Sequence, residues 1–245
     1  MPRLIPFRLA AVCALAFAFA LSTTAIAAAK GVPASLRVVG ANGKILAEEA
    51  LTTGTTSVPT SKKATCFGKG TGGSGKAATV KGATALGLLA QGAKSNSALR
   101  PLLVTDSFSF GLGLCGIGKS VQTKKLSWYL KVNHKDPELG GDAVKLHAGD
   151  EVLWDLAPYP YPNELALTAP AEALPGVPFT VNVFSYSDKG KRKPAAGVTV
   201  TGATSPTDAS GTTTVVLTQP TKLFATHGKE IPSNGASVCL VGICP

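Results

Sequence analysis

The sequence has few of the side chains that enzymes use most often for catalysis. Its 245 residues include three histidines and 14 Asp and Glu residues, and no G-x-S-x-G motif is present. A Ser or Cys nucleophile needs a base beside it, and that base is most often a histidine. The sequence therefore gives no indication of a hydrolytic triad, and we predict a protein without enzymatic activity.

Long apolar runs are also scarce, because only residues 9–21 form one. A run of this length falls short of the roughly 20 residues that a membrane-spanning helix needs. Arg3 and Arg8 stand near its start, and small residues suited to cleavage follow at Ala25 and Ala27. This arrangement is typical of a secretory signal peptide over residues 1–27. We expect a secreted, extracellular protein, either free or associated with the cell wall, with no membrane span.

Cysteine is sparse as well. Beyond the signal peptide four cysteines remain, Cys66, Cys115, Cys239 and Cys244. They lack the paired CxxC spacing of a zinc site and have no histidine beside them, so disulfides are favoured in an exported protein. Four cysteines allow three pairings. We favour Cys66 with Cys115 and Cys239 with Cys244, because each bond then stays within one proposed domain.

The remaining candidates for metal chemistry are two histidines and a few acids in one loop. Their positions are His134, Asp136, Glu138, Asp142 and His147. Oxygen and imidazole ligands of this kind bind divalent metals when they converge on one point. Charged side chains in a loop are more often solvated, and this is the interpretation that we favour. We therefore predict no metal and no cofactor.

Glycine-rich and basic segments match nucleotide- and nucleic-acid-binding patterns only in part. Residues 70–77 come close to a phosphate-binding loop, but Ala77 stands where that motif needs Ser or Thr. The densest basic run, residues 189–193, is flanked by turn residues and is expected to be a solvated hairpin tip. Stacking on nucleic acid would need aromatic side chains among the basic ones. We predict no nucleic-acid partner.

Periodicity predicts the elements of the first half. Residues 34–39 alternate like a strand, and Asn42-Gly43 is a hairpin turn signal. Residues 52–76 are rich in Thr, Ser, Gly and Lys, which predicts a long exposed loop. Residues 83–91 have apolar side chains at helical spacing, with Thr84 as the N-cap. Further strands are expected at 102–104, 107–110, 126–133, 144–146 and 151–154.

A proline-rich segment then divides the chain. Residues 157–163 contain alternating prolines, which favour an extended, semi-rigid linker. Beyond it, short apolar runs separated by turn signals predict a small antiparallel sandwich. The expected strands are 165–168, 179–186, 198–201, 212–217, 222–225 and 237–241.

Four segments of the first half, in order, carry a resemblance to a known domain. They are ATALGLLAQ (83–91), FGLGLCGIG (110–118), SWYLKVN (127–133) and HAGDEVLW (147–154). Over residues 35–156 the chain resembles the C-terminal domain of transcobalamin and intrinsic factor, which is also found in secreted bacterial proteins. The resemblance implies an α+β, β-grasp-like domain over residues 34–156, with one main helix on a curved sheet. It also implies cobalamin as an alternative ligand, although this chain has no all-helical domain to cover the other face of a corrin.

The second half carries a separate resemblance. Its motifs are PAAGVTV (194–200), TDASGT (207–212) and LFAT (223–226). Residues 164–245 resemble the immunoglobulin-like or carboxypeptidase-regulatory-like sandwiches of bacterial surface proteins, closed here by a C-terminal disulfide loop. Such domains usually act as spacers or stalks. The resemblance implies no binding site.

The function that these patterns favour is that of a secreted, non-enzymatic binding or surface-interaction protein. Aromatic and apolar side chains dominate most contact surfaces. If the chain has a ligand site, we expect Phe110, Leu112, Trp128, Tyr129 and Trp154 to frame it, although these residues fit an ordinary core better. The ligand would be an unidentified small molecule or a polymer of the cell wall.

Two other functions stay open at this point. Asp150 and Glu151 lie close to Trp154 in the sequence. A carbohydrate-active hydrolase would need two such carboxyls facing one cleft at a separation of roughly 5–10 Å. A purely structural component of the cell wall is the other alternative, and it would attach to polymers in a way that weakens with salt.

Overall fold

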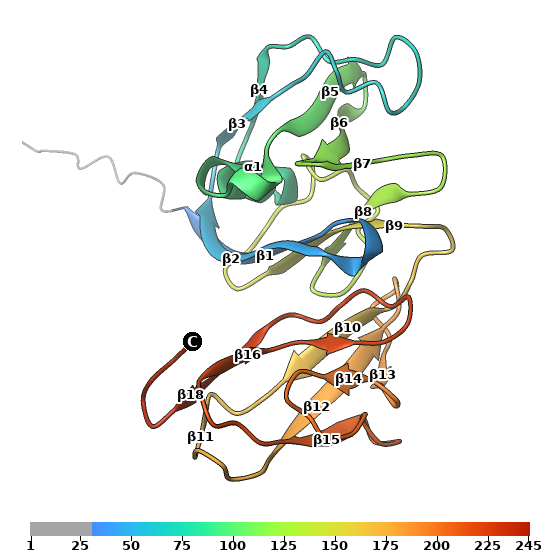
Figure 1. Cartoon of the computed structure of the whole chain (residues 1–245). Helices are drawn as coiled ribbons and strands as arrows, with labels where there is room; N and C mark the ends of the chain where they lie inside the picture. Colours follow the sequence, from blue (N-terminus) through green and yellow to red (C-terminus); the bar gives the residue numbers. More distant parts are fainter. Residues whose placement is uncertain (1–30) are drawn as a thin grey trace, which may run out of the picture.

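The computed structural model describes residues 31–245, so the predicted signal peptide, residues 1–27, lies outside the described residues. The chain forms two stacked regions (Figure 1): an N-terminal region, residues 31–157, and a C-terminal region, residues 158–245. Within residues 31–245, no helix has both the length and the apolar character required to cross a membrane.

A central sheet lies on the side of the N-terminal region that faces the C-terminal region (Figure 1). Its strand order is β2-β1-β9-β8. The bounds are β1 Val32–Val39, β2 Ile45–Thr53, β8 Ser127–Val132 and β9 Glu151–Ala157. β1 runs antiparallel to β2 and parallel to β9, and β9 runs antiparallel to β8. The predicted turn between β1 and β2 is confirmed, because Asn42 and Gly43 both have positive φ, as a tight hairpin of this kind requires.

The central sheet is buried on both faces, because strand side chains alternate between them. One face packs under the helix and is apolar; it includes Leu36, Val38, Leu130, Val152 and Trp154. The opposite face is turned to the C-terminal region; it includes Arg37, Val39, Lys131, Leu153 and Asp155. The second face therefore brings charged side chains into the interior of the molecule.

The one α-helix among residues 31–245, α1, spans Ala85–Ser95 and packs on β1 and β2. The predicted cap is confirmed: the Thr84 hydroxyl accepts a hydrogen bond from the Gly87 N–H at 3.0 Å. Such a cap satisfies one of the free N–H groups of the first helical turn. Gly92 lets the helix approach the sheet, since a Cβ there would lie 2.7 Å from Leu36.

Two smaller sheets complete the N-terminal region. One pairs β3 Thr56–Pro59 with β4 Ala77–Val80, and the other contains β5 Leu102–Phe108, β6 Gly111–Ile117 and β7 Ser120–Val121. Short 3-10 helices occupy Ala41–Gly43 and Ser97–Leu99. The predicted loop over residues 52–76 is therefore wrong in its first part, because β3 lies within it. The strand expected at 144–146 is reduced to one bridge between Lys145 and Thr84.

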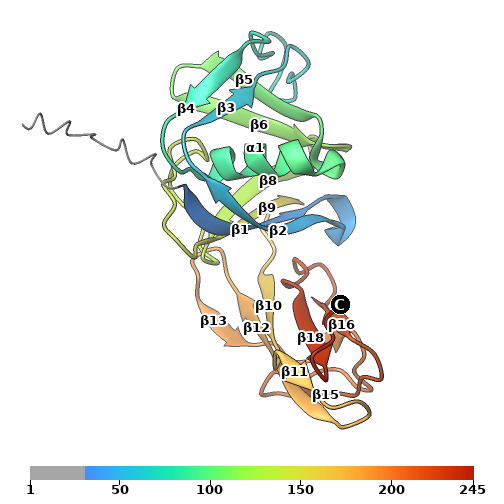
Figure 2. The same ribbon diagram turned by 90° about the vertical axis from the view of Figure 1, so that its left-hand side faces the viewer.

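The fold class expected from the sequence is wrong. Within residues 31–245, strands make up 44% of the residues and helices 8%, and the strands are divided among several small sheets. The N-terminal region is therefore mostly β and not an α+β fold with one main helix on a curved sheet. The physical reason lies in which strands pair: β3 pairs with β4, and β5 with β6, so none of these strands joins the central sheet, and separate short sheets lie above the helix (Figure 2).

The C-terminal region consists of strands, arranged in three small sheets and not in the expected two-sheet sandwich. The first contains β10 Glu164–Thr168, β12 Phe179–Tyr186, β13 Arg192–Pro194 and β15 Thr212–Val215. The second contains β11 Glu172–Ala173, β16 Thr221–Leu223 and β18 Ala236–Leu240, and the third pairs β14 Thr199–Val200 with β17 Ala225–Thr226. These sheets (Figure 2) share one apolar core, to which β10, β12 and β18 each contribute two buried residues.

The described part of the chain contains two disulfides, and they have the pairing that the sequence favoured. Cys66 is bonded to Cys115, which ties the loop of residues 60–76 to β6. Cys239 is bonded to Cys244 and closes a short loop at the end of β18. Both bonds are compatible with a secreted protein.

Candidate functional site

The five residues expected to frame a ligand site do not come together. Trp154 is buried among the core residues below the helix, beside Gly141, and half-buried Trp128 packs against the same core. Tyr129 lies on the opposite face of β8, where its ring packs on that of Tyr161 with the centroids 4.1 Å apart. Core packing therefore accounts for the two tryptophans, and the contact between the regions accounts for Tyr129.

Phe110 has a different environment, because it occupies the two-residue turn between β5 and β6. Its side chain is 83% exposed. The ring stacks on that of Phe108, with the centroids 5.0 Å apart, and Phe108 meets Phe67 edge-on at 5.3 Å. We call these three residues the aromatic tip. Half-buried Leu112 follows on β6.

A glycine and a disulfide hold the aromatic tip in place. A Cβ on Gly113 would lie 2.8 Å from the Phe108 ring and 3.0 Å from the Phe67 ring, so both rings lie directly over this glycine. Cys66 precedes Phe67 and is bonded to Cys115 of β6. The rings are thus fixed from two sides, although they belong to segments that are far apart in the sequence.

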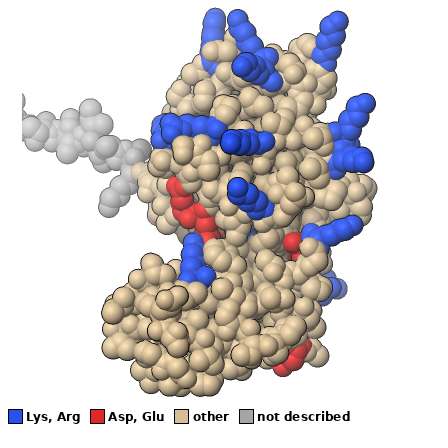
Figure 3. Space-filling model, viewed as in Figure 1, with Lys and Arg blue, Asp and Glu red and all other residues tan. Residues whose placement is uncertain are grey.

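The loop that carries Phe67 is strongly basic. Residues 60–81 contain five exposed lysines and no acidic residue: Lys62, Lys63, Lys69, Lys76 and Lys81. Figure 3 shows Lys and Arg side chains projecting from this end of the molecule, in the same view as Figure 1. Exposed aromatic rings and an excess of positive charge therefore occur on the same loop and hairpin.

The glycine-rich stretch in this loop binds a carboxylate of its own chain. The backbone N–H and the hydroxyl of Ser74 each donate a hydrogen bond of 2.6 Å to Asp106 of β5. These two bonds hold the pKa of Asp106 below its ordinary value. The near-match to a phosphate-binding loop is therefore explained by an internal contact that fastens the loop to β5.

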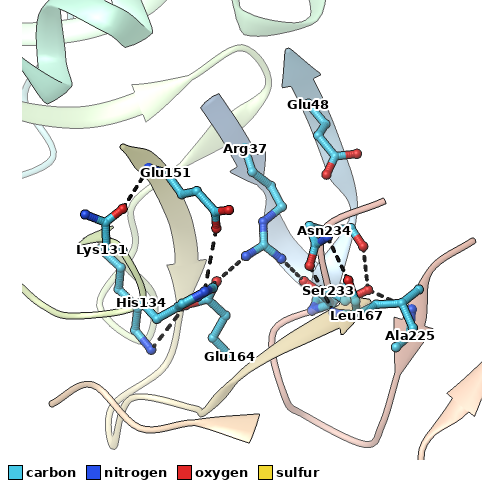
Figure 4. A network of polar contacts seen from close by, with 12 residues as sticks. Arg37, Glu48, Lys131, His134, Glu151, Glu164, Leu167, Ala225, Ser233 and Asn234 are labelled. Atoms are coloured by element: carbon cyan, nitrogen blue, oxygen red, sulfur yellow. Dashed lines mark hydrogen bonds and ion pairs between the residues drawn. The ribbon is translucent and has the colours of Figure 1, made fainter. Parts of the chain in front are cut away.

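A buried ionic cluster fills the junction between the two regions (Figure 4). Arg37 of β1 donates hydrogen bonds to the Glu164 carboxylate and to the Pro232 carbonyl. Glu164 is 1% exposed and also lies 3.0 Å from Nδ1 of His134. Burial alone would raise the pKa of Glu164, but the contact with His134 and the charges of Arg37 and Lys131 outweigh it and hold the pKa below its ordinary value.

Lys131 and Asp155 belong to the same cluster and are almost completely enclosed, at 0% and 3% exposed. Burial lowers the pKa of Lys131, although the Glu164 carboxylate opposes the shift. Burial raises the pKa of Asp155 to about 7, although the charges of Arg37 and Lys131 oppose the shift. Both shifts favour the uncharged forms, as desolvation does in general.

A second set of contacts fastens the other side of the junction. Glu48 of β2 accepts a hydrogen bond from the Gly235 N–H at 2.6 Å and pairs with Lys222 at the same distance. Within the C-terminal region, the Asn234 side chain both donates to and accepts from the backbone of Leu167. A cavity of about 700 Å³ also lies at the junction, between Asp155 and the loop of residues 226–232. The two regions are thus joined by charged, polar and apolar contacts.

The histidines and acids considered for metal or hydrolytic chemistry are engaged elsewhere. His134 contacts Glu164 and Glu151, and His147 contacts Asp150. Among residues 31–245, no group of three or more His, Cys, Asp or Glu side chains is placed to hold a metal ion. One oxygen of Asp150 accepts the His147 N–H and the other accepts the Asn133 amide, so this carboxylate holds a turn.

Comparison of the chain with known protein families, curated proteins and solved structures finds no match. The resemblances noted in the sequence therefore stay predictions.

Sequence reasoning missed the ionic cluster, although a signal for it was present. Arg37, Lys131 and Asp155 each stand inside an otherwise apolar strand, in SLRVV, WYLKV and VLWDL. A charged residue in the middle of such a strand indicates a second buried face. Phe67 gave no comparable signal, because it stands alone in a polar loop.

Proposed function

We propose that this chain is a secreted, non-enzymatic surface-interaction protein that binds an anionic polymer of the cell surface through the aromatic tip and its lysines. The observation that carries the proposal is the coincidence of three fixed aromatic rings with five exposed lysines on one loop and hairpin. The C-terminal region serves as the base on which this surface is presented.

The surface suits a polysaccharide that carries negatively charged groups and whose sugar rings have apolar faces. Lysines attract phosphate, sulfate or carboxylate groups over several ångströms, and that attraction weakens with salt. The faces of Phe67 and Phe110 offer flat apolar area for sugar rings. Rings that are already fixed lose little conformational freedom on binding, which favours affinity.

The architecture supports presentation of this surface at a distance. Figures 1 and 2 place the loop of residues 60–76 and the C-terminal region at opposite ends of the molecule. The contacts of Arg37 and Glu48 across the junction hold the two regions together. Because these contacts hold both sides of the junction, the aromatic tip keeps a constant direction relative to the C-terminal region.

The experiment compares binding of the chain without residues 1–27 to dextran sulfate and to neutral dextran, which share a backbone and differ in charge. We expect saturable binding to dextran sulfate and none to dextran. Phe67→Ala with Phe110→Ala is expected to weaken binding by about 10-fold with an unchanged salt slope, since apolar contacts are not screened. Leu174→Ala, an exposed apolar residue of the C-terminal region, is the matched control.

A charge variant completes the test. Lys69→Gln with Lys76→Gln is expected to weaken binding and to reduce its salt slope, whereas Lys191→Gln with Lys193→Gln in the C-terminal region leaves both unchanged. Equal effects of the two lysine pairs would contradict a specific surface. Binding to phosphatidylglycerol vesicles but not to dextran sulfate would replace the polymer by a lipid surface, and saturable one-to-one binding of cobalamin would favour the corrinoid alternative.

A further inference from the structure

Lys131 and Asp155 are diagonal neighbours on one face of the central sheet. Tyr129 pairs with Asp155 and Lys131 pairs with Leu153, so the two residues stand two positions apart across adjacent antiparallel strands. Cα atoms in this arrangement are about 7–8 Å apart, within the combined reach of a lysine and an aspartate side chain. Both side chains point to the junction, away from the helix.

The reacting ends of both side chains are buried and lack hydrogen bonds. Within residues 31–245, neither the Lys131 ammonium nor one carboxylate oxygen of Asp155, Oδ2, has a hydrogen-bond partner. The Lys131 nitrogen lies 5.0 Å from the centre of the Tyr161 ring, which is itself largely buried. A buried polar group without a partner costs free energy and is therefore rare. This juxtaposition calls for a chemical explanation.

A second carboxylate, that of Glu164, is fixed beside the amine. Glu164 Oε2 lies 3.9 Å from the Lys131 nitrogen and has no hydrogen-bond partner of its own within the described part of the chain. The other oxygen of Glu164 is held by Arg37 and His134, which keeps the carboxylate in place. Figure 4 shows the Lys131 ammonium directed at Glu164. A positioned carboxylate of this kind serves as a proton acceptor and donor.

We propose that Lys131 and Asp155 become joined by an amide bond between Nζ and Cγ, formed spontaneously within the folded chain with Glu164 as the proton carrier. Glu164 accepts a proton from the Lys131 ammonium, and the free amine attacks Cγ of the protonated Asp155 carboxyl. The Nζ–Cγ bond forms and the Cγ–OH bond breaks, and the leaving hydroxyl takes a proton from Glu164. The nitrogen then passes its second proton to Glu164, which ends protonated beside a neutral amide. One water molecule leaves, and no oxidant or further reactant is needed.

The surroundings favour this condensation over hydrolysis. Burial favours the free amine of Lys131 and the protonated carboxyl of Asp155, which are the reactive forms. Two groups held in one site react as if at very high concentration. In the structure the Lys131 ammonium pairs with Glu164 and not with Asp155. The reaction therefore includes rotation of the Lys131 side chain, which breaks no hydrogen bond.

The experiment is mass spectrometry of the purified chain without residues 1–27. We expect the intact mass to lie below the calculated mass of the disulfide-bonded chain by one water molecule. Trypsin does not cleave after an acylated lysine, so the digest is expected to contain residues 126–135 joined to residues 146–189. A folded chain with the full calculated mass and two separate peptides overturns the proposal.

Four variants test whether an amide bond joins Lys131 and Asp155 or whether the two side chains are only packed near each other. Lys131→Met and Asp155→Ala are expected to restore the full mass. Asp155→Asn is expected to lose one ammonia in place of one water, because an amide can leave in the same reaction. Glu164→Gln is expected to retain the full mass. Lys222→Met, at the other ionic contact of the junction, is the matched control and keeps the loss of water. Loss of water in Lys131→Met would assign the dehydration to another pair of residues.

Discussion

Arg37 of β1 and Glu164 of β10 form an ion pair between the two regions, with both side chains almost completely buried. Each residue belongs to a different region, so this contact exists only when the two regions are docked. A buried charge that loses its partner is strongly destabilising, because no water replaces the lost contact. The pair therefore links the stability of the junction to the stability of the whole chain.

Removal of Arg37 tests this link. Arg37→Met keeps most of the side-chain stem and leaves Glu164 without its main counter-charge, so we expect the free energy of unfolding to fall by about 3–5 kcal/mol. Lys222→Met removes a partner that is 38% exposed at the edge of the junction, and we expect a loss of at most about 1 kcal/mol. Urea unfolding of both variants measures the difference. Similar losses in both would mean that burial does not govern these pairs.

The lowered pKa of Glu164 predicts a specific dependence of stability on pH. A carboxyl with a lower pKa in the folded state than its ordinary value of 4.5 binds protons less well when folded. Its contribution to stability is therefore present above about pH 4.5 and is lost as the pH falls through the folded-state pKa. The groups that face it are Arg37, Lys131 and His134.

The check is the difference in free energy of unfolding between the wild-type chain and Glu164→Gln, measured from pH 7 downward. We expect this difference to be largest above about pH 4.5 and to shrink in more acidic solution. A difference that grows on acidification would show that the pKa of Glu164 is raised and not lowered.

The disulfides are expected to contribute unequally. Cys66 and Cys115 are 49 residues apart, and loop-closure entropy predicts a loss of about 4 kcal/mol in Cys66→Ser with Cys115→Ser. Cys239 and Cys244 are 5 residues apart, and the corresponding double variant is expected to lose about 2 kcal/mol. Thermal or urea unfolding gives both values. The first double variant is also expected to lose binding to dextran sulfate, because Phe67 is no longer held over β6.

Gly113 provides a test of the aromatic tip that leaves its charges unchanged. Gly113→Ala places a methyl group against Phe67 and Phe108, and we expect a loss of about 1–3 kcal/mol together with displacement of both rings. Gly54→Ala is the matched control, since no atom lies within 4 Å of its added Cβ. Proton NMR of the phenylalanine rings reports the displacement. Unchanged ring shifts in Gly113→Ala would show that the rings are not seated on this glycine.

Local features of the chain could be predicted from the sequence, and long-range ones could not. The Thr84 cap and the Asn42-Gly43 turn depend on neighbouring residues, so their patterns are sufficient. β3 was missed because a strand of four residues, Thr56–Pro59, has no alternation long enough to detect. The sheet boundaries depend on which strands pair, and that choice is made by packing and not by the pattern of any one strand.

For the candidate sites, too, the sequence indicated single residues but not the long-range contacts between them. The sequence pointed to Phe110 as a candidate ligand-site residue, which stays a prediction, but it gave no reason to join Phe110 to Phe67, which a disulfide and a glycine fix beside Phe108. Lys131 and Glu164 are in contact because the two regions pack together. This packing produces no periodic pattern in the sequence of either segment. Trp128 and Trp154 were grouped with Phe110 by residue type alone, whereas strand alternation assigns them to the core.

The two-sided burial of the central sheet decides how this chain can be divided for study. A fragment that ends at Ala157 would expose Val39 and Leu153 to water together with the charges beside them. A fragment that starts at Asn163 would carry Glu164 with no cation to meet it. The proline-rich segment is therefore not a cutting site, and the two regions belong in one piece for expression, crystallisation or fusion.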